Sequence, residues 1–126
     1  MNSLYKLDMD IQMFIEAAIQ SSKAVDYSEK SEIRTHNQAI DCYRKIAKNI
    51  DANYPDRLSD FSMLLKHENV HVRLCCAICM IEFMSFSIEQ KKRAIYTVQK
   101  YIDSTNDSIE KAGLNVWLKK QKHLLG

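Results

Sequence analysis

Glycine and proline are scarce along this chain, and that scarcity constrains the fold more than any other feature. The 126 residues include two glycines and one proline. Sandwiches, barrels and loop-rich folds need many tight turns, and tight turns are built largely from these two residue types. Long helices joined by short connections need few of them. The composition therefore predicts an all-α fold. We expect one domain over residues 1–126, because this length leaves little room for a second.

Apolar residues recur at helical spacing in six segments, which we expect to be helices. Asp8, Asn69 and the pair Ser87 and Gln90 are suited to cap helix starts, the last two as a capping box. The Asn-Tyr-Pro sequence that ends at Pro55 predicts a turn. The segment 70–84 is apolar almost all round, so we expect it in the middle of the packing. The predicted helices span about 9–25, 30–50, 56–66, 70–84, 88–102 and 108–123.

An internal repeat relates three of these segments. EIRTHNQA (32–39), HVRLCCAI (71–78) and SIEKAGLN (108–115) align on Ile33, Val72 and Ile109, at intervals of 39 and 37 residues. Each of the three residues opens the second helix of a predicted pair. HEAT repeats have about this period and this helix-pair unit. We therefore expect a right-handed α-α superhelix, a short HEAT-like stack of about six helices.

The segment HENVH (67–71) matches the H-E-x-x-H pattern, in which two histidines bind Zn²⁺ from one helical face. The repeat instead predicts a turn here, with Asn69 capping the next helix and His71 in its first turn. His67 and His71 would then not share a continuous helix. We therefore predict turn histidines, no metal site and no enzymatic activity.

The four cysteines predict packing rather than chemistry. Cys75, Cys76 and Cys79 lie within five residues of one apolar segment, where a disulfide framework is implausible. Thiols in the middle of an apolar helix lack the helix N-terminus that activates a redox cysteine. We expect small-residue packing, free thiols including Cys42, no cofactor and a reducing, cytoplasmic location.

Targeting and membrane segments are not expected. The N-terminal MNSLYKLDMD is polar and carries acidic residues early, unlike a signal peptide. No apolar run reaches the roughly 18 residues that a membrane span requires. We therefore predict no membrane partner.

Several single side chains are predicted to be structural. Arg73 follows Val72 in the first turn of a helix, where we expect it to bond to turn carbonyls or to an acid of the adjacent repeat. Trp117 is expected as a packed, partly exposed indole that closes the end of the stack. Four methionines fall at apolar helical positions and are predicted to lie in the core: Met13, Met63, Met80 and Met84.

The net charge of +2 is too near neutral to imply nucleic acid by itself. The charge is uneven, since residues 1–60 hold 10 acidic and 8 basic side chains, and residues 61–126 hold 6 acidic and 10 basic ones. Ordinary solvated helix faces are the favoured interpretation. Nucleic-acid binding by the basic C-terminal helices is a minor alternative, so no nucleic-acid partner is expected.

Four stretches together resemble a small bacterial HEAT-like family of domains of unknown function. They are FIEAAIQSSKAVDY (14–27), the spacing from Asn37 to Asp41 followed by Tyr43-Arg44, LLKHENVHVRLCCA (64–77) and GLNVWLKKQK (113–122). The resemblance covers nearly the whole chain, from Phe14 to Gly126. The chain departs from the family pattern at Cys75 and Cys76 and in a longer link over 84–90, and neither departure threatens the fold.

What the resemblance implies is binding rather than catalysis. Members are similar to proteins encoded beside polymorphic or contact-dependent growth inhibition toxins, where small proteins act as cognate immunity proteins. This implies a cytoplasmic protein that binds and neutralises one toxin domain, with no catalytic residue to carry over. A nuclease toxin with a basic active site would favour acidic contacts. The predicted partner-binding residues are Asp26, Glu29, Glu32, Asp51, Asp56 and Asp60.

Two questions stay open at this point. A generic cytoplasmic HEAT-like adaptor or scaffold with another protein partner is the alternative function. The oligomeric state is expected to be a monomer or a weak dimer, because the edge helices of short stacks expose apolar surface.

Overall fold

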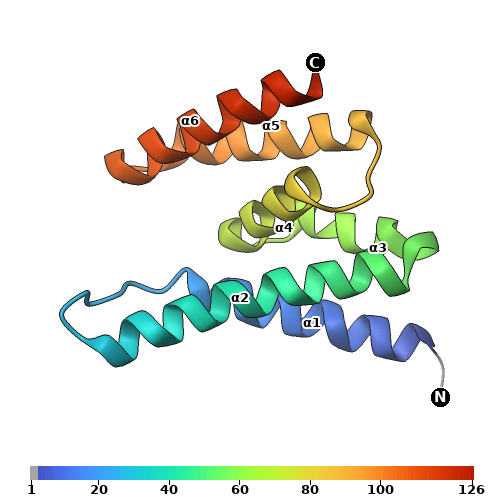
Figure 1. The fold of residues 1–126 in the computed structure, drawn as a ribbon, viewed down its shortest axis with the longest axis horizontal. Helices are drawn as coiled ribbons and strands as arrows, with labels where there is room; N and C mark the ends of the chain where they lie inside the picture. Colours follow the sequence, from blue (N-terminus) through green and yellow to red (C-terminus); the bar gives the residue numbers. More distant parts are fainter. Residues whose placement is uncertain (1–2) are drawn as a thin grey trace. The chain divides into compact units, whose positions relative to one another are not determined.

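The computed structural model describes residues 3–126, which form six α-helices and two short 3₁₀ helices (Figure 1). The described residues contain no strand, so the all-α prediction is confirmed. The chain packs as two compact units, Met1–Phe61 and Ser62–Gly126, here called unit 1 and unit 2. In chain order the elements are α1 (Ser3–Ser21), α2 (Lys30–Asn53), η1 (Pro55–Arg57), α3 (Leu58–Ser62), η2 (Met63–Lys66), α4 (Val70–Glu82), α5 (Ile88–Ser104) and α6 (Ser108–Leu125).

Unit 1 is built on α1 and α2, which run antiparallel (Figure 1). The fully buried ring of Phe14 makes edge contacts with Tyr43 of α2, at 5.5 Å between ring centroids, and with Phe61 of α3, at 4.9 Å. About one turn before Phe14 on α1, the carboxylate of Asp10 accepts from the Asn49 side-chain amide at 3.3 Å. Aromatic edge contacts of this kind add to the free energy of burial, so Phe14 is the centre of this core.

Unit 2 is centred on α4, whose side chains are buried on most sides, as its sequence predicts. Its start is held by Asn69, whose side chain accepts from the amides of His71 and Val72 at 2.9 and 3.2 Å. The capping box of Ser87 and Gln90 begins α5, as predicted. The last two helices, α5 and α6, lie antiparallel in Figure 1. The free backbone amides at the starts of α4 and α5 therefore have hydrogen-bond acceptors in the preceding connections.

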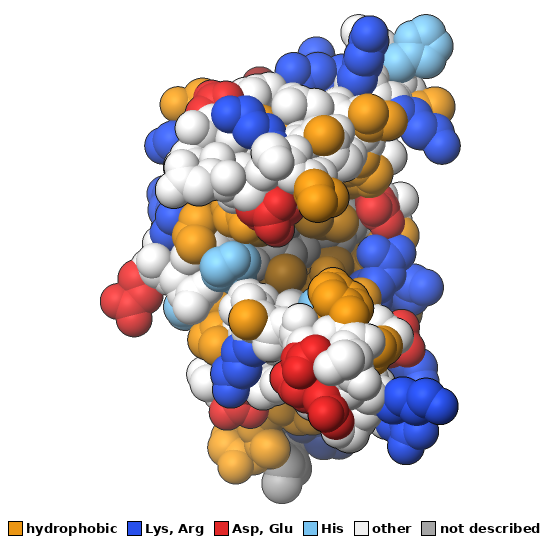
Figure 2. Space-filling model, turned by 90° about the vertical axis from the view of Figure 1, so that its left-hand side faces the viewer, with side chains coloured by type: hydrophobic (Ala, Val, Ile, Leu, Met, Phe, Trp, Pro, Cys, Tyr) orange, Lys and Arg blue, Asp and Glu red, His pale blue; other side chains and the backbone are white. Residues whose placement is uncertain are grey.

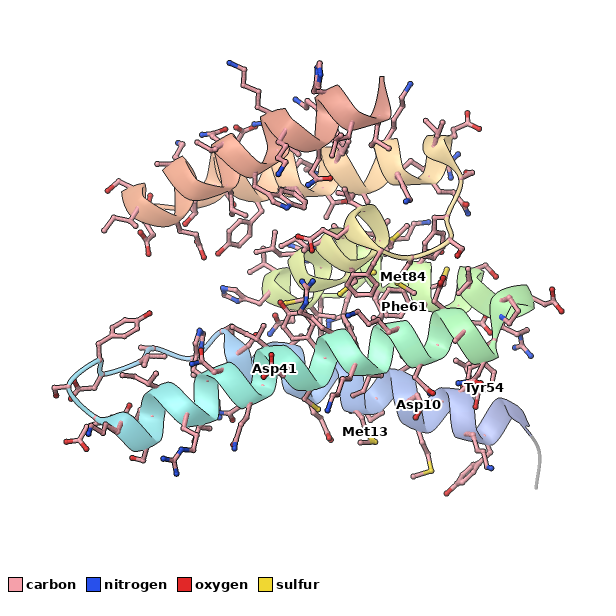
Figure 3. The ribbon with its side chains drawn as sticks, viewed as in Figure 1. Asp10, Met13, Asp41, Tyr54, Phe61 and Met84 are labelled. Atoms are coloured by element: carbon pink, nitrogen blue, oxygen red, sulfur yellow. The ribbon has the colours of Figure 1, made fainter. Side chains whose placement is uncertain are left out.

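Three predictions about local structure are wrong. Asp8 does not cap the first helix, which begins at Ser3 and contains it. The helix predicted over 56–66 is divided among η1, α3 and η2. Met13 and Met63 are 48% and 62% exposed, whereas Met80 and Met84 are buried as predicted. Figure 3 shows Met13 pointing outward from α1.

The repeat is reflected in the helix starts. Ile33, Val72 and Ile109 lie in the first turns of α2, α4 and α6. The superhelical arrangement and the single HEAT-like domain stay predictions. None of the helices within residues 3–126 combines the length and the apolar character that crossing a bilayer requires.

Candidate functional site

A groove of about 500 Å³ lies on unit 2, between one face of α5 and the segment from η2 to the middle of α4. The α5 residues that line it follow one another at intervals of three and one, which keeps them on a single helical face. They extend from position 93 to position 104, so this wall is about 17 Å long. The wall consists of Arg93, Tyr96, Thr97, Lys100, Tyr101 and Ser104.

The opposite wall of the groove is mostly apolar. Leu65 comes from η2, and Val70 and Leu74 come from the first turns of α4. Leu74 is buried, whereas Leu65 and Val70 are half-buried, so aliphatic surface faces the opening. Tyr96 stands across from them and is 63% exposed. Apolar surface left accessible in a concave site favours a ligand with apolar groups.

Basic side chains surround the apolar surface formed by Leu65, Val70 and Leu74, here called the floor of the groove. Lys66, Arg73, Arg93 and Lys100 all line the groove, and no acidic residue of the described chain does. The Lys100 ammonium lies 5.4 Å from the centre of the Tyr96 ring, which holds both side chains at the rim. Neither the Lys66 ammonium nor the Arg93 guanidinium has a hydrogen-bond or ion-pair partner among residues 3–126. The groove therefore presents uncompensated positive charge.

Arg73 has a structural role as well. Its Nη1 donates to the carbonyls of His67 and Glu68 at 2.6 and 3.1 Å. This confirms the prediction that Arg73 bonds to turn carbonyls. These bonds fasten the connection between η2 and α4, so one wall of the groove is already ordered.

Tyr101 lines the groove and also belongs to a polar network with His71, Thr105 and Glu110. Its hydroxyl donates to the carboxylate of Glu110 at 2.6 Å and lies 3.5 Å from Nε2 of His71. Thr105 donates to the same carboxylate at 3.1 Å. Burial, followed by the hydrogen bond to Glu110, raises the pKa of Tyr101 well above its ordinary value. Tyr101 is therefore a neutral, fixed side chain at neutral pH.

The HENVH segment forms the turn that the sequence predicts. His67 has extended backbone angles (φ −63°, ψ 147°) after η2, and His71 lies in the first turn of α4. The two histidines therefore do not share a helix. Nδ1 of His67 accepts from the Asn69 amide at 3.0 Å, so this ring supports the turn. Within residues 3–126 no three His, Cys, Asp or Glu side chains are grouped as a metal site would require.

The cysteine cluster lies inside α4. Cys75, Cys76 and Cys79 are buried, Cys42 is exposed, and none of the four forms a disulfide within the described residues. Burial raises the pKa of the Cys76 thiol well above its ordinary value. These positions match the predicted packing role, because a buried neutral thiol behaves as a small apolar group.

The six predicted acidic residues all belong to the part of the chain up to residue 60, and the structure separates them into two groups. Figure 2 shows the end of unit 1 that carries the connection between α1 and α2, and Asp and Glu side chains gather at this end. Glu32 and Asp51 are 19 residues apart on α2, which is about 28 Å along the helix axis. The first group is Asp26, Glu29 and Glu32, and the second is Asp51, Asp56 and Asp60.

Some of these carboxylates already have partners within the chain. Asp26 accepts from the Ser28 hydroxyl at 2.6 Å and from its amide at 2.9 Å, and these hydrogen bonds lower the pKa of Asp26. Glu32 accepts from the Asp26 amide at 3.4 Å. Asp60 pairs with Arg57 at 2.7 Å. The six acidic residues thus do not form one continuous surface, and some of their carboxylates already have hydrogen-bond or ion-pair partners within the chain.

None of the residues that line the groove was predicted from the sequence to bind a partner. The spacing of Arg93, Tyr96 and Lys100 places two cations and an aromatic ring on one face of α5, and this pattern is visible in the sequence. Trp117, in contrast, is half-buried as predicted, and its Nε1 donates to Glu82 at 2.9 Å, whereas its place at the end of a stack stays a prediction.

Comparisons with known proteins find no match to this chain among family models, curated proteins or solved structures. The HEAT-like resemblance therefore stays an expectation. Function must be argued from the groove and its charges.

Proposed function

We propose that this chain is a protein-binding module and that the groove on unit 2 is its binding surface. In its sharper form, the proposal is an immunity protein that binds and neutralises a cognate bacterial toxin of the contact-dependent growth inhibition type. The observation that carries the binding role is the apolar floor of the groove, left accessible between ordered walls and surrounded by cations. The rival within the same class is a cytoplasmic adaptor with another protein partner.

Order within the groove supports binding. Arg73 and Asn69 fasten the turn that forms one wall, and α5 is a continuous helix along the other. A surface that is ordered before binding loses little conformational entropy when a partner docks. The half-buried Leu65 and Val70 and the exposed Tyr96 face the same groove, which gives a partner aliphatic and aromatic surface to bury.

The acidic residues of unit 1 support a separate surface for a basic partner. If a nuclease toxin binds there, the two acidic groups would make distinct contacts, since about 28 Å of α2 lies between Glu32 and Asp51. Tyr27 lies beside the first group and is 75% exposed. It therefore offers a position from which that surface can be probed independently of the groove.

The test is photo-crosslinking in the native host. A benzophenone amino acid replaces Tyr96 in one form of the tagged chain and Tyr27 in another, and crosslinked partners are identified by mass spectrometry. We expect one dominant protein partner captured from position 96. Capture from position 27 alone would move the binding surface to the acidic residues. Absence of a dominant partner from either position would contradict the protein-binding proposal.

The immunity form has its own test. The captured partner is expressed alone in a heterologous bacterium and then together with this chain. Toxicity that the chain relieves would support the immunity role. A partner that is harmless when expressed alone would favour the adaptor.

A further inference from the structure

We infer that the groove on unit 2 accepts an acidic, amphipathic helix about three turns long from the partner protein. This inference rests on the proposed function, because it specifies what a protein partner places in the groove. It makes a claim that the proposed function does not, since a protein could also dock there through a loop or a strand.

The length of the groove suits a short helix. The α5 residues that line it extend over positions 93–104, about 17 Å, and a helix of that length has about 11 residues or three turns. Helices dock in grooves by placing residues at i, i+3, i+4 and i+7 on an apolar floor. Leu65, Val70 and Leu74 provide that floor on the wall opposite α5.

The charge of the groove selects an acidic helix. Arg93 and Lys100 are seven residues apart on α5, so they lie two turns apart on the same face, about 10 Å along the axis. Lys66 and Arg73 carry positive charge on the other wall. An amphipathic helix with carboxylates on both sides of its apolar stripe would place an acidic side chain near each cation. Such pairing steers association and rejects partners of like charge.

Other anionic ligands match the groove less well. A fatty acid has one carboxylate, whereas the four cations of the groove are spread along both walls. A nucleic acid binds by phosphate contacts together with base stacking or base-edge hydrogen bonds. The floor formed by Leu65, Val70 and Leu74 offers neither of the last two, and the exposed Tyr96 ring offers stacking for a single base only. The hydroxyl of Tyr101 is already donated to Glu110.

The experiment is selection of a displayed library of random 16-residue peptides on the full 126-residue chain. Three forms of the chain are compared. The groove variant carries Arg93→Glu and Lys100→Glu, and the control variant carries Lys92→Glu and Lys119→Glu. All four side chains are exposed, and neither Lys92 nor Lys119 lines the groove. The two variants have the same net charge, and circular dichroism verifies that both are folded.

We expect the wild-type chain to enrich peptides with Glu or Asp flanking apolar residues at helical spacing. Their dissociation constants should rise about tenfold or more in the groove variant, since two attractive contacts become repulsive, and should change less than about twofold in the control. Added salt should weaken binding. Selection of peptides without this pattern, equal binding to the groove variant, or no enrichment would overturn the inference.

Two further probes separate the alternatives. Fluorescent laurate and a 12-nucleotide single-stranded DNA are titrated into the same three forms. Binding of either one that is lost only in the groove variant, without any acidic peptide, would assign the groove to that ligand. A partner crosslinked from position 96 through a segment that is not an acidic helix would overturn this inference and leave the proposed function standing.

Discussion

Replacement of Phe14 by alanine should be among the most damaging single changes in unit 1. The ring is fully buried and makes edge contacts with Tyr43 and Phe61. Removing it forfeits about 2 kcal/mol of apolar transfer free energy. If roughly 80 Å³ of the vacated space stays empty, the cavity costs about 2 kcal/mol more. The expected loss is thus about 4 kcal/mol of a total stability of about 5–15 kcal/mol.

The neighbouring Met13 provides a matched control on the same helix. It is 48% exposed and points outward from α1, so Met13→Ala leaves no enclosed cavity and should cost about 1 kcal/mol or less. Urea unfolding followed by circular dichroism measures both effects. With a urea dependence of about 2 kcal/mol per molar, the midpoint should fall by about 2 M for Phe14→Ala and by at most about 0.5 M for Met13→Ala.

A double-mutant cycle tests the reasoning further. Phe14→Ala and Phe61→Ala should be non-additive by about 1 kcal/mol, because the two rings share an edge contact. Equal midpoint shifts for Phe14→Ala and Met13→Ala would refute the assigned packing of unit 1. Strict additivity with Phe61→Ala would refute the contact between the two rings.

Three more predictions concern unit 2 and can be checked with the same unfolding assay. Gly113→Ala should stabilise the chain by about 0.5–1 kcal/mol, because an added Cβ would meet nothing within 4 Å in the interior of α6, and a destabilised variant would contradict this. Asn69→Ala should cost about 1 kcal/mol through loss of the α4 cap, whereas the exposed Asn106→Ala should be nearly neutral, and equal effects would refute the cap. The raised pKa of Tyr101 means that its contribution to stability is intact below about pH 10 and declines above it, as the unfolded chain ionises first. The fall in unfolding free energy between about pH 9 and 11 should therefore be shallower in Tyr101→Phe, and an unchanged slope would contradict the raised pKa of Tyr101.

The helices of this chain could be predicted where local chemistry marks their ends. Asn69 and the Ser87–Gln90 capping box have side chains that satisfy free backbone amides, so the starts of α4 and α5 were predicted correctly. Pro55 disfavours helix at the residue before it, but α2 continues to Asn53, three residues beyond its predicted end at 50. The first helix has no such marker. Asp8 has the right side chain for a cap, but the helix begins five residues earlier, at Ser3.

Burial was harder to predict than helix position. Met13 and Met63 fall at apolar spacing, yet each lies on the exposed side of its element. A periodic pattern places residues on one face, but packing against neighbouring elements decides how wide the buried face is. Local contacts also weaken the prediction of an acidic binding surface. Ser28 donates to Asp26 and Arg57 pairs with Asp60, and both acidic residues were predicted to bind a partner.

The groove lay beyond sequence reasoning for a similar reason. Arg93, Tyr96 and Lys100 share a face by their spacing alone, and that much can be seen in the sequence. That η2 and the start of α4 form a wall opposite them depends on tertiary packing. A row of basic residues on a helix ordinarily marks a face exposed to solvent. Only the accessible apolar floor beside it indicates that a ligand binds there.

The most direct test of the binding role is co-purification of partners from the native host by three tagged forms of the chain. The wild type, the groove variant Arg93→Glu with Lys100→Glu and the control variant Lys92→Glu with Lys119→Glu are compared by quantitative mass spectrometry. We predict one protein retained by the wild type and the control and depleted about tenfold or more with the groove variant. Equal retention by all three forms, or no specific partner with any of them, would contradict the assignment of the groove as a protein-binding surface.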